Sequence, residues 1–133
     1  VKDKKLENVV MIERQPKEDM DKVWSLCDVA LIPLINSDLF KTVIPSKMFE
    51  CMGMGIPMIM SVPEGEATSL LRANGAGIVC KPQDVQGIQE AVNKLYSNKK
   101  LYTKLQNNCI KNASKFSRSE LAKEVLDSIK KSI

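Results

Sequence analysis

The sequence has no histidine and few aromatic residues, which make up 5% of its 133 positions. Without histidine, acid–base catalysis by an imidazole is excluded. The four cysteines are widely spaced, with no Cys-x-x-Cys pair, which argues against a zinc site. No apolar run approaches the roughly 20 residues that span a bilayer, and no signal peptide is visible. What is there, 44% hydrophobic and 27% charged residues, is the composition of one globular domain.

The net charge of +4 is carried mainly by scattered lysines. Nucleic-acid-binding proteins cluster arginine and aromatic residues, so we expect no DNA or RNA partner. A solvated surface is the favoured interpretation. Attraction to an anionic membrane surface is the alternative, since each basic residue there contributes about 1 kcal/mol. Three of the four cysteines lie in apolar runs, which is typical of reduced core residues. We therefore expect a cytoplasmic protein, with peripheral contact at the inner membrane face as the alternative.

Strands and helices alternate along the first part of the chain. Short apolar runs predict strands over 8–12, 29–34, 58–60 and 78–80. Because these runs are apolar throughout, we expect both faces of the sheet to be covered. The alternation predicts an α/β fold with a doubly wound, Rossmann-like parallel sheet.

The helices between and after the strands carry clear boundary signals. Pro16 followed by acidic residues predicts a helix start. The apolar residues of that helix repeat at helical spacing, so we expect one buried stripe with Trp24 as a core residue rather than a ligand platform. The stripe comprises Met20, Val23, Trp24 and Cys27. We divide the chain into βα units over about 1–83 and C-terminal helices over 84–133.

Three of these helices follow one another without a strand. Asp84 predicts the start of the first, which Asn98 closes, and the second runs over about 100–112. The third begins with a capping box, Ser117-x-x-Glu120. We expect all three to be packing elements, with the exposed face of the last as a candidate contact surface.

The most informative segment is 42–59, which predicts a loop, a short helix and a buried strand. Ser46 suits the N-cap and Lys47 the first helical residue, while Gly53 and Gly55 are expected to end the helix. Glu50 lies on the second turn among apolar side chains. Two interpretations of Glu50 stay open: a partly solvated helix residue, or a fixed acceptor aimed at the hydroxyls of a ligand.

Ligands of such sheets bind at the carboxyl ends of the strands, beside helix N-termini. The loops at that edge are 13–16, 35–45 and 61–66. The amides at the start of the helix over 46–54 suit a diphosphate or sugar hydroxyls, and Lys47 adds a point charge. Glu66 either faces the ligand or caps the helix over 67–73, and capping is favoured.

The run Pro45-Ser46-Lys47-Met48-Phe49-Glu50, followed by Gly53, Gly55 and Pro57, resembles the nucleotide-sugar site of family 4 glycosyltransferases. These are retaining enzymes of the GT-B fold. Weaker similarities cover nearly the whole chain: 8–16 resembles the third strand and its loop, 27–34 the fourth strand and 75–79 the sixth. The resemblance implies the C-terminal, nucleotide-sugar-binding domain of such an enzyme.

The same resemblance implies roles for single residues. The carboxylate of Glu50 would bind the ribose hydroxyls, the backbone from Lys41 to Ile44 would meet the transferred sugar, and Ile12 to Arg14 would flank the base. Arg14 is equally well explained as an ordinary exposed arginine. The implied donor-binding residues are Arg14, Thr42, Val43, Ile44, Pro45, Ser46, Lys47, Glu50 and Glu66. We assign no catalytic residue, no metal and no cofactor apart from the nucleotide sugar itself, which we expect to be UDP-linked.

Two positions depart from the family pattern. Thr42 stands where many members have a second glutamate, and this variant resembles a subgroup that uses amino-sugar nucleotides in cell-surface polysaccharide assembly. Glu13 stands where a glycine is usual, which bears on the base-side loop.

The family's donor domain also begins with two further βα units, which this chain does not match. In the usual strand order 3-2-1-4-5-6, those units supply the strands between the one at 8–12 and the one at 29–34. The chain begins with Val1 rather than Met, so we expect a piece of a longer protein whose N-terminal acceptor domain is a partner. This polypeptide alone is then expected to be inactive. Its sheet would pair its strands anew or associate with another copy through exposed edges.

Two other functions remain open. One is a GT-B epimerase acting on a UDP-sugar, although such enzymes usually carry histidine in the cleft. The other is a non-enzymatic Rossmann-like interaction module, for which Glu50 would be irrelevant to nucleotide binding. Dinucleotide binding is disfavoured because no Gly-x-Gly-x-x-Gly follows a strand.

Overall fold

A computed structural model describes residues 6–132 of the chain as an α/β fold with a three-stranded parallel sheet. The strands are β1 (Ala30–Pro33), β2 (Met58–Ser61) and β3 (Gly77–Cys80), in that spatial order. The helices are α1 (Met20–Ser25), α2 (Lys47–Met54), α3 (Glu66–Asn74), α4 (Val85–Ser97), α5 (Lys99–Ala113) and α6 (Arg118–Lys131). Short 3₁₀ turns occur at Lys17–Asp19, Asp38–Lys41 and Ser114–Phe116. The expected α/β fold with a parallel sheet is confirmed.

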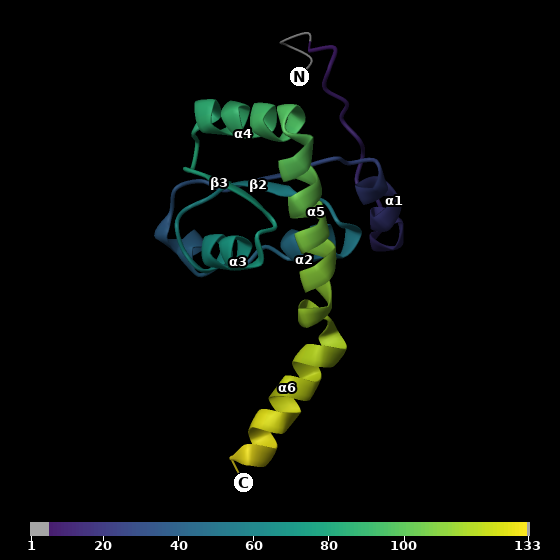
Figure 1. Cartoon of the computed structure of the whole chain (residues 1–133), viewed down its shortest axis with the longest axis vertical. Coiled ribbons are helices and arrows are strands. Elements are labelled where there is room, and N and C mark those ends of the chain that lie inside the picture. The colour runs from purple at the N-terminus through teal and green to yellow at the C-terminus, as the bar shows by residue number, and fades with distance from the viewer. Residues whose placement is uncertain (1–5, 133) are drawn as a thin grey trace.

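Helices cover the sheet from both sides. In Figure 1, α2 and α3 lie below the strands, α4 lies above them, and α5 runs past the edge of both layers. The central strand β2 is buried along its whole length. Its side chains alternate between the layers, because Met58 and Met60 join the cluster around α2 and α3 while Ile59 joins the cluster around α4. The doubly wound arrangement therefore follows from the apolar runs as expected.

The helix boundaries in the C-terminal half match the capping signals. Asp84 Oδ1 accepts a hydrogen bond of 2.9 Å from the Gly87 amide at the start of α4. Asn98 closes α4 and also caps α5, where its Oδ1 accepts from the Leu101 amide at 2.9 Å. Ser117 Oγ accepts from the Glu120 amide at 3.3 Å. Short polar side chains at these positions satisfy amides that have no partner inside the helix.

The prediction of a strand over 8–12 is wrong. Residues 9–12 are not helical and do not pair with another strand, and Val10 and Met11 are 81% and 75% exposed. A strand needs a neighbour for its backbone groups, and the described residues provide none for this segment. The apolar pattern alone could not show that the partner strand is missing.

The prediction that both faces of the strand at 29–34 are covered is also wrong. Ala30 and Ile32 are buried against the α2 side, whereas Leu31 on the α4 side is 52% exposed. The Ala30 amide donates to Pro57 O, just before β2, and the Leu34 amide donates to Ser61 O of β2. The alternate residues of β1 therefore turn their backbone groups to the other edge. No strand pairs with that edge among the described residues, and Pro33, which lacks an N–H, stands there.

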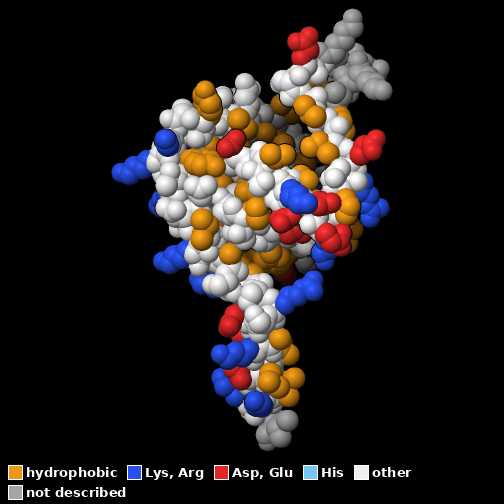
Figure 2. All heavy atoms as spheres, turned by 90° about the vertical axis from the view of Figure 1, so that its right-hand side faces the viewer, with side chains coloured by type: hydrophobic (Ala, Val, Ile, Leu, Met, Phe, Trp, Pro, Cys, Tyr) orange, Lys and Arg blue, Asp and Glu red, His pale blue; other side chains and the backbone are white. Residues whose placement is uncertain are grey.

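The last helix was expected to pack on the domain, and this is wrong as well. No residue of α6 is buried, and Figure 1 shows the helix extending away from the body of the molecule. Apolar side chains gather along one side of α6 and charged ones along the other (Figure 2). The apolar side includes Leu121, Val125, Leu126 and Ile129, which are 45–59% exposed. Within residues 6–132, no helix combines the length and apolar character needed to cross a membrane.

Candidate nucleotide-sugar site

The buried side of α2 determines which of its other side chains face the solvent. Met48, Cys51 and Met52 are at most 1% exposed and pack in the main core cluster. Burial raises the pKa of the Cys51 thiol to about 12, so the thiol stays neutral. With these three residues turned inward at helical spacing, Glu50 is directed to the surface.

The ends of α2 follow from local chemistry, with two differences from expectation. Ser46 occupies the N-cap position, but its hydroxyl makes no capping hydrogen bond; the backbone turn is closed by the Met48 amide, which donates to Pro45 O at 3.0 Å. Gly53 lies inside the helix and does not end it. Gly55 ends it, in a left-handed conformation with φ of 69°.

Glu50 is held by a partner that is distant in the sequence. Trp24 Nε1 donates to Glu50 Oε2 at 3.0 Å, which joins α1 to α2. The two residues share a shallow groove of about 270 Å³, whose walls also include Lys17, Met20, Asp21, Phe49, Gly53 and Met54. The Glu50 carboxylate is exposed in this groove and has acceptor capacity left for a ligand.

The prediction that Trp24 is a core residue is therefore only half right. The side chain is half-buried and packs against the core cluster, but its indole N–H reaches the candidate site. The other residues of the predicted stripe are likewise half-buried: Met20, Val23 and Cys27. Helical spacing identified the apolar face of α1, whereas nothing in the sequence indicated a contact between positions 24 and 50.

The loop before α2 lies against the start of α3. An ideal Cβ built on Gly65 would be 2.0 Å from the Lys41 carbonyl oxygen, so the two backbones are in direct contact. The side chains of Thr42, Val43 and Ile44 follow this contact and are exposed. Lys41 pairs with Asp38 at 2.6 Å within the same loop, which lowers the pKa of the Asp38 carboxyl. The contact brings together the loops over 35–45 and 61–66, as the sheet topology predicted.

A polar network fixes the turn before α3. Glu64 accepts two hydrogen bonds of 2.7 Å from the Arg72 guanidinium and one of 2.9 Å from Thr68 Oγ1. The pairing with Arg72, followed by the bond from Thr68, lowers the pKa of Glu64 to about 2. The Gly65 amide donates to the hydroxyl of Thr68, which is fully buried. The sequence does not predict this network, because Glu64 and Arg72 are eight positions apart and Glu64 precedes the helix.

Glu66 is the first residue of α3 and is exposed. It accepts no capping hydrogen bond, so its contribution to the helix start is the favourable charge at the positive end of the dipole.

Arg14 is not brought to this site. It is exposed in a segment without regular structure, and it does not line the groove of Glu50. Its expected position depended on a strand over 8–12, which the structure does not contain.

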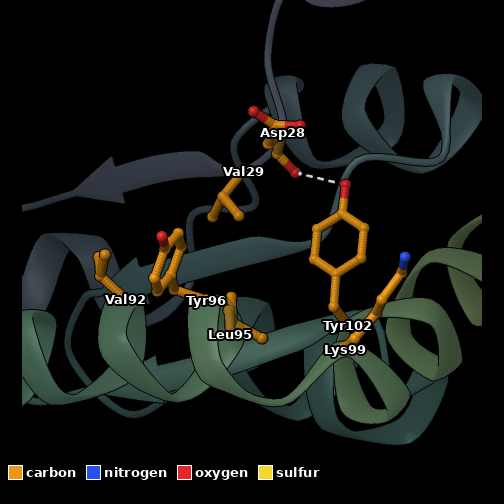
Figure 3. A pocket seen from close by; sticks show the side chains of 7 residues that line it. All are labelled: Asp28, Val29, Val92, Leu95, Tyr96, Lys99 and Tyr102. Atoms are coloured by element: carbon orange, nitrogen blue, oxygen red, sulfur yellow. Dashed lines mark hydrogen bonds between the residues drawn. The ribbon is translucent and has the colours of Figure 1, made fainter.

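A larger hollow of about 460 Å³ lies at the opposite edge of the sheet, beside the entry to β1. Figure 3 shows Tyr102 reaching from α5 to the Asp28 carbonyl oxygen, to which its hydroxyl donates at 3.1 Å. The rest of the lining is largely apolar and comes from Val29, Val92, Leu95 and Tyr96, with Lys99 as a further charged residue. Ligands of doubly wound sheets bind at the carboxyl ends of the strands, whereas this hollow adjoins an amino end. We therefore place the candidate site at α2 despite the smaller volume there.

Comparison with known proteins assigns the chain to a family. The family model described as "Glycosyl transferases group 1" matches residues 1–116. The chain belongs to this family. It is also 33% identical over 82 residues to a probable sucrose-phosphate synthase of Vicia faba and to sucrose-phosphate synthase 1 of Arabidopsis thaliana. Each match covers 62% of this chain and 8% of the relative, so the chain spans only a small part of the length of these two relatives.

Proposed function

We propose that this chain is the nucleotide-sugar-binding part of a retaining glycosyltransferase, with a UDP-sugar as donor. The single observation that carries the proposal is the exposed Glu50 carboxylate, held by Trp24 at 3.0 Å in the groove beside α2. A fixed carboxylate matches the vicinal hydroxyls of a ribose, because it can accept two charge-assisted hydrogen bonds at once. Membership of the glycosyl transferases group 1 family supports sugar transfer in general.

The rest of the donor would extend from Glu50 across the start of α2. The amides of Ser46 and Lys47 stand at the positive end of this helix, where a diphosphate is favoured, and the Lys47 ammonium adds charge. The backbone of Thr42, Val43 and Ile44 would meet the sugar. Arg14 would reach the base only if its segment changes conformation.

In the intact enzyme the sugar would pass to a glycan or lipid-linked acceptor in cell-surface polysaccharide synthesis. Transfer would depend mainly on positioning and on stabilisation of the leaving diphosphate. We propose that this polypeptide alone binds the donor without transferring it, since the acceptor would be supplied by another domain. The names of the two plant relatives indicate enzymes that form a sugar phosphate, which supports sugar chemistry without specifying this chain's acceptor.

Calorimetric titration of UDP, GDP and ADP onto the chain tests this proposal. We expect saturable binding with a preference for UDP, and about tenfold weaker binding or more in Glu50→Gln, because each charge-assisted bond contributes about 1.5–3 kcal/mol. Glu124→Gln, an exposed glutamate on α6, is the matched control and should leave binding unchanged. Equal binding in wild type and Glu50→Gln would falsify the assigned role of Glu50 and favour the non-enzymatic module.

A further inference from the structure

Gly65 is the point at which the loop before α2 touches the start of α3. A Cβ at this position would lie 2.0 Å from the Lys41 carbonyl oxygen, 2.7 Å from its carbonyl carbon and 2.8 Å from its Cα. All three neighbours are backbone atoms, so a side chain cannot be accommodated by a change of rotamer. The φ of Gly65 is 173°, an extended conformation open to any residue. The position therefore needs glycine for space and not for its backbone angles.

The α3 side of this contact is held by several hydrogen bonds. The Gly65 amide donates to Thr68 Oγ1 at 3.0 Å, and Thr68 is fully buried. The neighbouring Glu64 is bound by Arg72 through two hydrogen bonds of 2.7 Å. The Gly65 amide is thus hydrogen-bonded, and the Glu64 side chain is bound by both Arg72 and Thr68. These bonds oppose displacement of the turn.

The loop side of the contact is held more weakly. The Phe40 amide donates to Ser37 O, and Lys41 pairs with Asp38, so both interactions remain within the loop. Lys41, Thr42 and Val43 are exposed. A side chain at position 65 would therefore displace the loop and leave the α3 turn in place.

We propose that Gly65 is a positioning residue that sets the loop over 41–44 at the distance needed to contact the sugar of the donor. This inference rests on the proposed function, and it assigns the sugar end of the site to the contact between the two loops. The nucleotide end lies elsewhere, because Glu50, in the first turn of α2 rather than the second as expected, is tied to Trp24 of α1. Displacing the loop therefore weakens binding of the sugar and leaves binding of the nucleotide unchanged.

Gly65→Ala separates the two ends of the site. We expect UDP to bind this variant as it binds wild type. UDP-glucose or UDP-N-acetylglucosamine should bind about fivefold to tenfold more weakly, as expected when one or two hydrogen bonds to the sugar are lost. Amide resonances of Thr42, Val43 and Ile44 should shift in the NMR spectrum of the unliganded variant. A general weakening of α3 would not produce this split between UDP and the UDP-sugars.

Ala73→Gly is the control for helix stability. It removes a methyl group from an exposed position in the last turn of α3, so it weakens the helix without touching the loop. Both UDP and UDP-sugar affinities should stay at wild-type values. If Gly65→Ala does not fold, Thr68→Val serves instead, since it removes the hydroxyl that holds the Gly65 amide and keeps the side-chain shape. Thr68→Ser should then restore sugar binding.

The outcomes are distinct. Equal affinity of wild type and Gly65→Ala for the UDP-sugars, or an equal loss for UDP and UDP-sugars, overturns the role of Gly65 while the donor site itself stands. Failure of wild type to bind either ligand overturns the proposed function and, with it, the sugar role of Gly65. In that event the NMR spectrum of Gly65→Ala still tests the loop. Unshifted amide resonances at 42–44 would show that Gly65 does not position the loop, and shifted resonances would limit the role of Gly65 to the structure of the loop.

Discussion

Two glycines, Gly53 inside α2 and Gly55 at its C-cap, should respond in opposite ways to substitution by alanine. Gly53 lies inside the helix, and a Cβ there would have no heavy atom within 4 Å. Gly53→Ala should therefore stabilise the domain by about 1 kcal/mol, the difference in helix propensity between the two residues. Gly55 ends the helix with φ of +69°, where an alanine side chain costs about 1–2 kcal/mol. Its Cβ would also approach Ile110 Cγ1 to 2.9 Å, although this exposed side chain can move.

The two variants should thus differ by about 2–3 kcal/mol in the free energy of unfolding. Urea unfolding followed by circular dichroism measures this difference, and the midpoints should fall on either side of the wild-type value. The slope of the transition should not change, because neither substitution alters the surface exposed on unfolding. A Gly53→Ala variant no more stable than wild type, or a Gly55→Ala variant as stable as wild type, would refute the placement of the helix end at Gly55.

Two further predictions concern titration and thiol chemistry. The pKa of Glu64 is lowered from 4.5 to about 2, so the stability from its pairing with Arg72 is present above pH 4.5 and lost as the pH falls toward 2. Arg72→Ala should remove this loss from the acid unfolding curve, and an unchanged curve would contradict it. Cys51 and Cys109 are fully buried, and burial raises their thiol pKa values to about 12 and about 11. An alkylating reagent at pH 8 should therefore modify the half-buried Cys27 first, and mass spectrometry of timed samples shows the order.

Sequence reasoning succeeded where local chemistry decides the outcome. Asp84 and Asn98 cap their helices because a short polar side chain next to an unpaired amide acts within one turn. The strand over 58–60 is buried on both faces as predicted, because α2 covers one face and α4 covers the other.

It failed where the outcome depends on a distant partner. An apolar run over 9–12 forms a strand only if another strand accepts its hydrogen bonds, and no pattern in the run reports this. The bond from Trp24 to Glu50 spans 26 positions and follows from the packing of α1 on α2. The contact of Gly65 with Lys41 also joins residues far apart in the sequence, and nothing in the sequence indicated it.

The central claim is that a nucleotide binds beside α2 through Glu50. Trp24 is the only tryptophan of the chain, so its indole N–H gives a single NMR resonance that reports directly on the Glu50 carboxylate. We predict that titration with UDP shifts this resonance saturably, together with the amides at the start of α2, and that Glu50→Gln greatly weakens the response. A saturable response confined to Tyr96 and Tyr102, at the opposite edge of the sheet, with the indole resonance unmoved, would contradict the account.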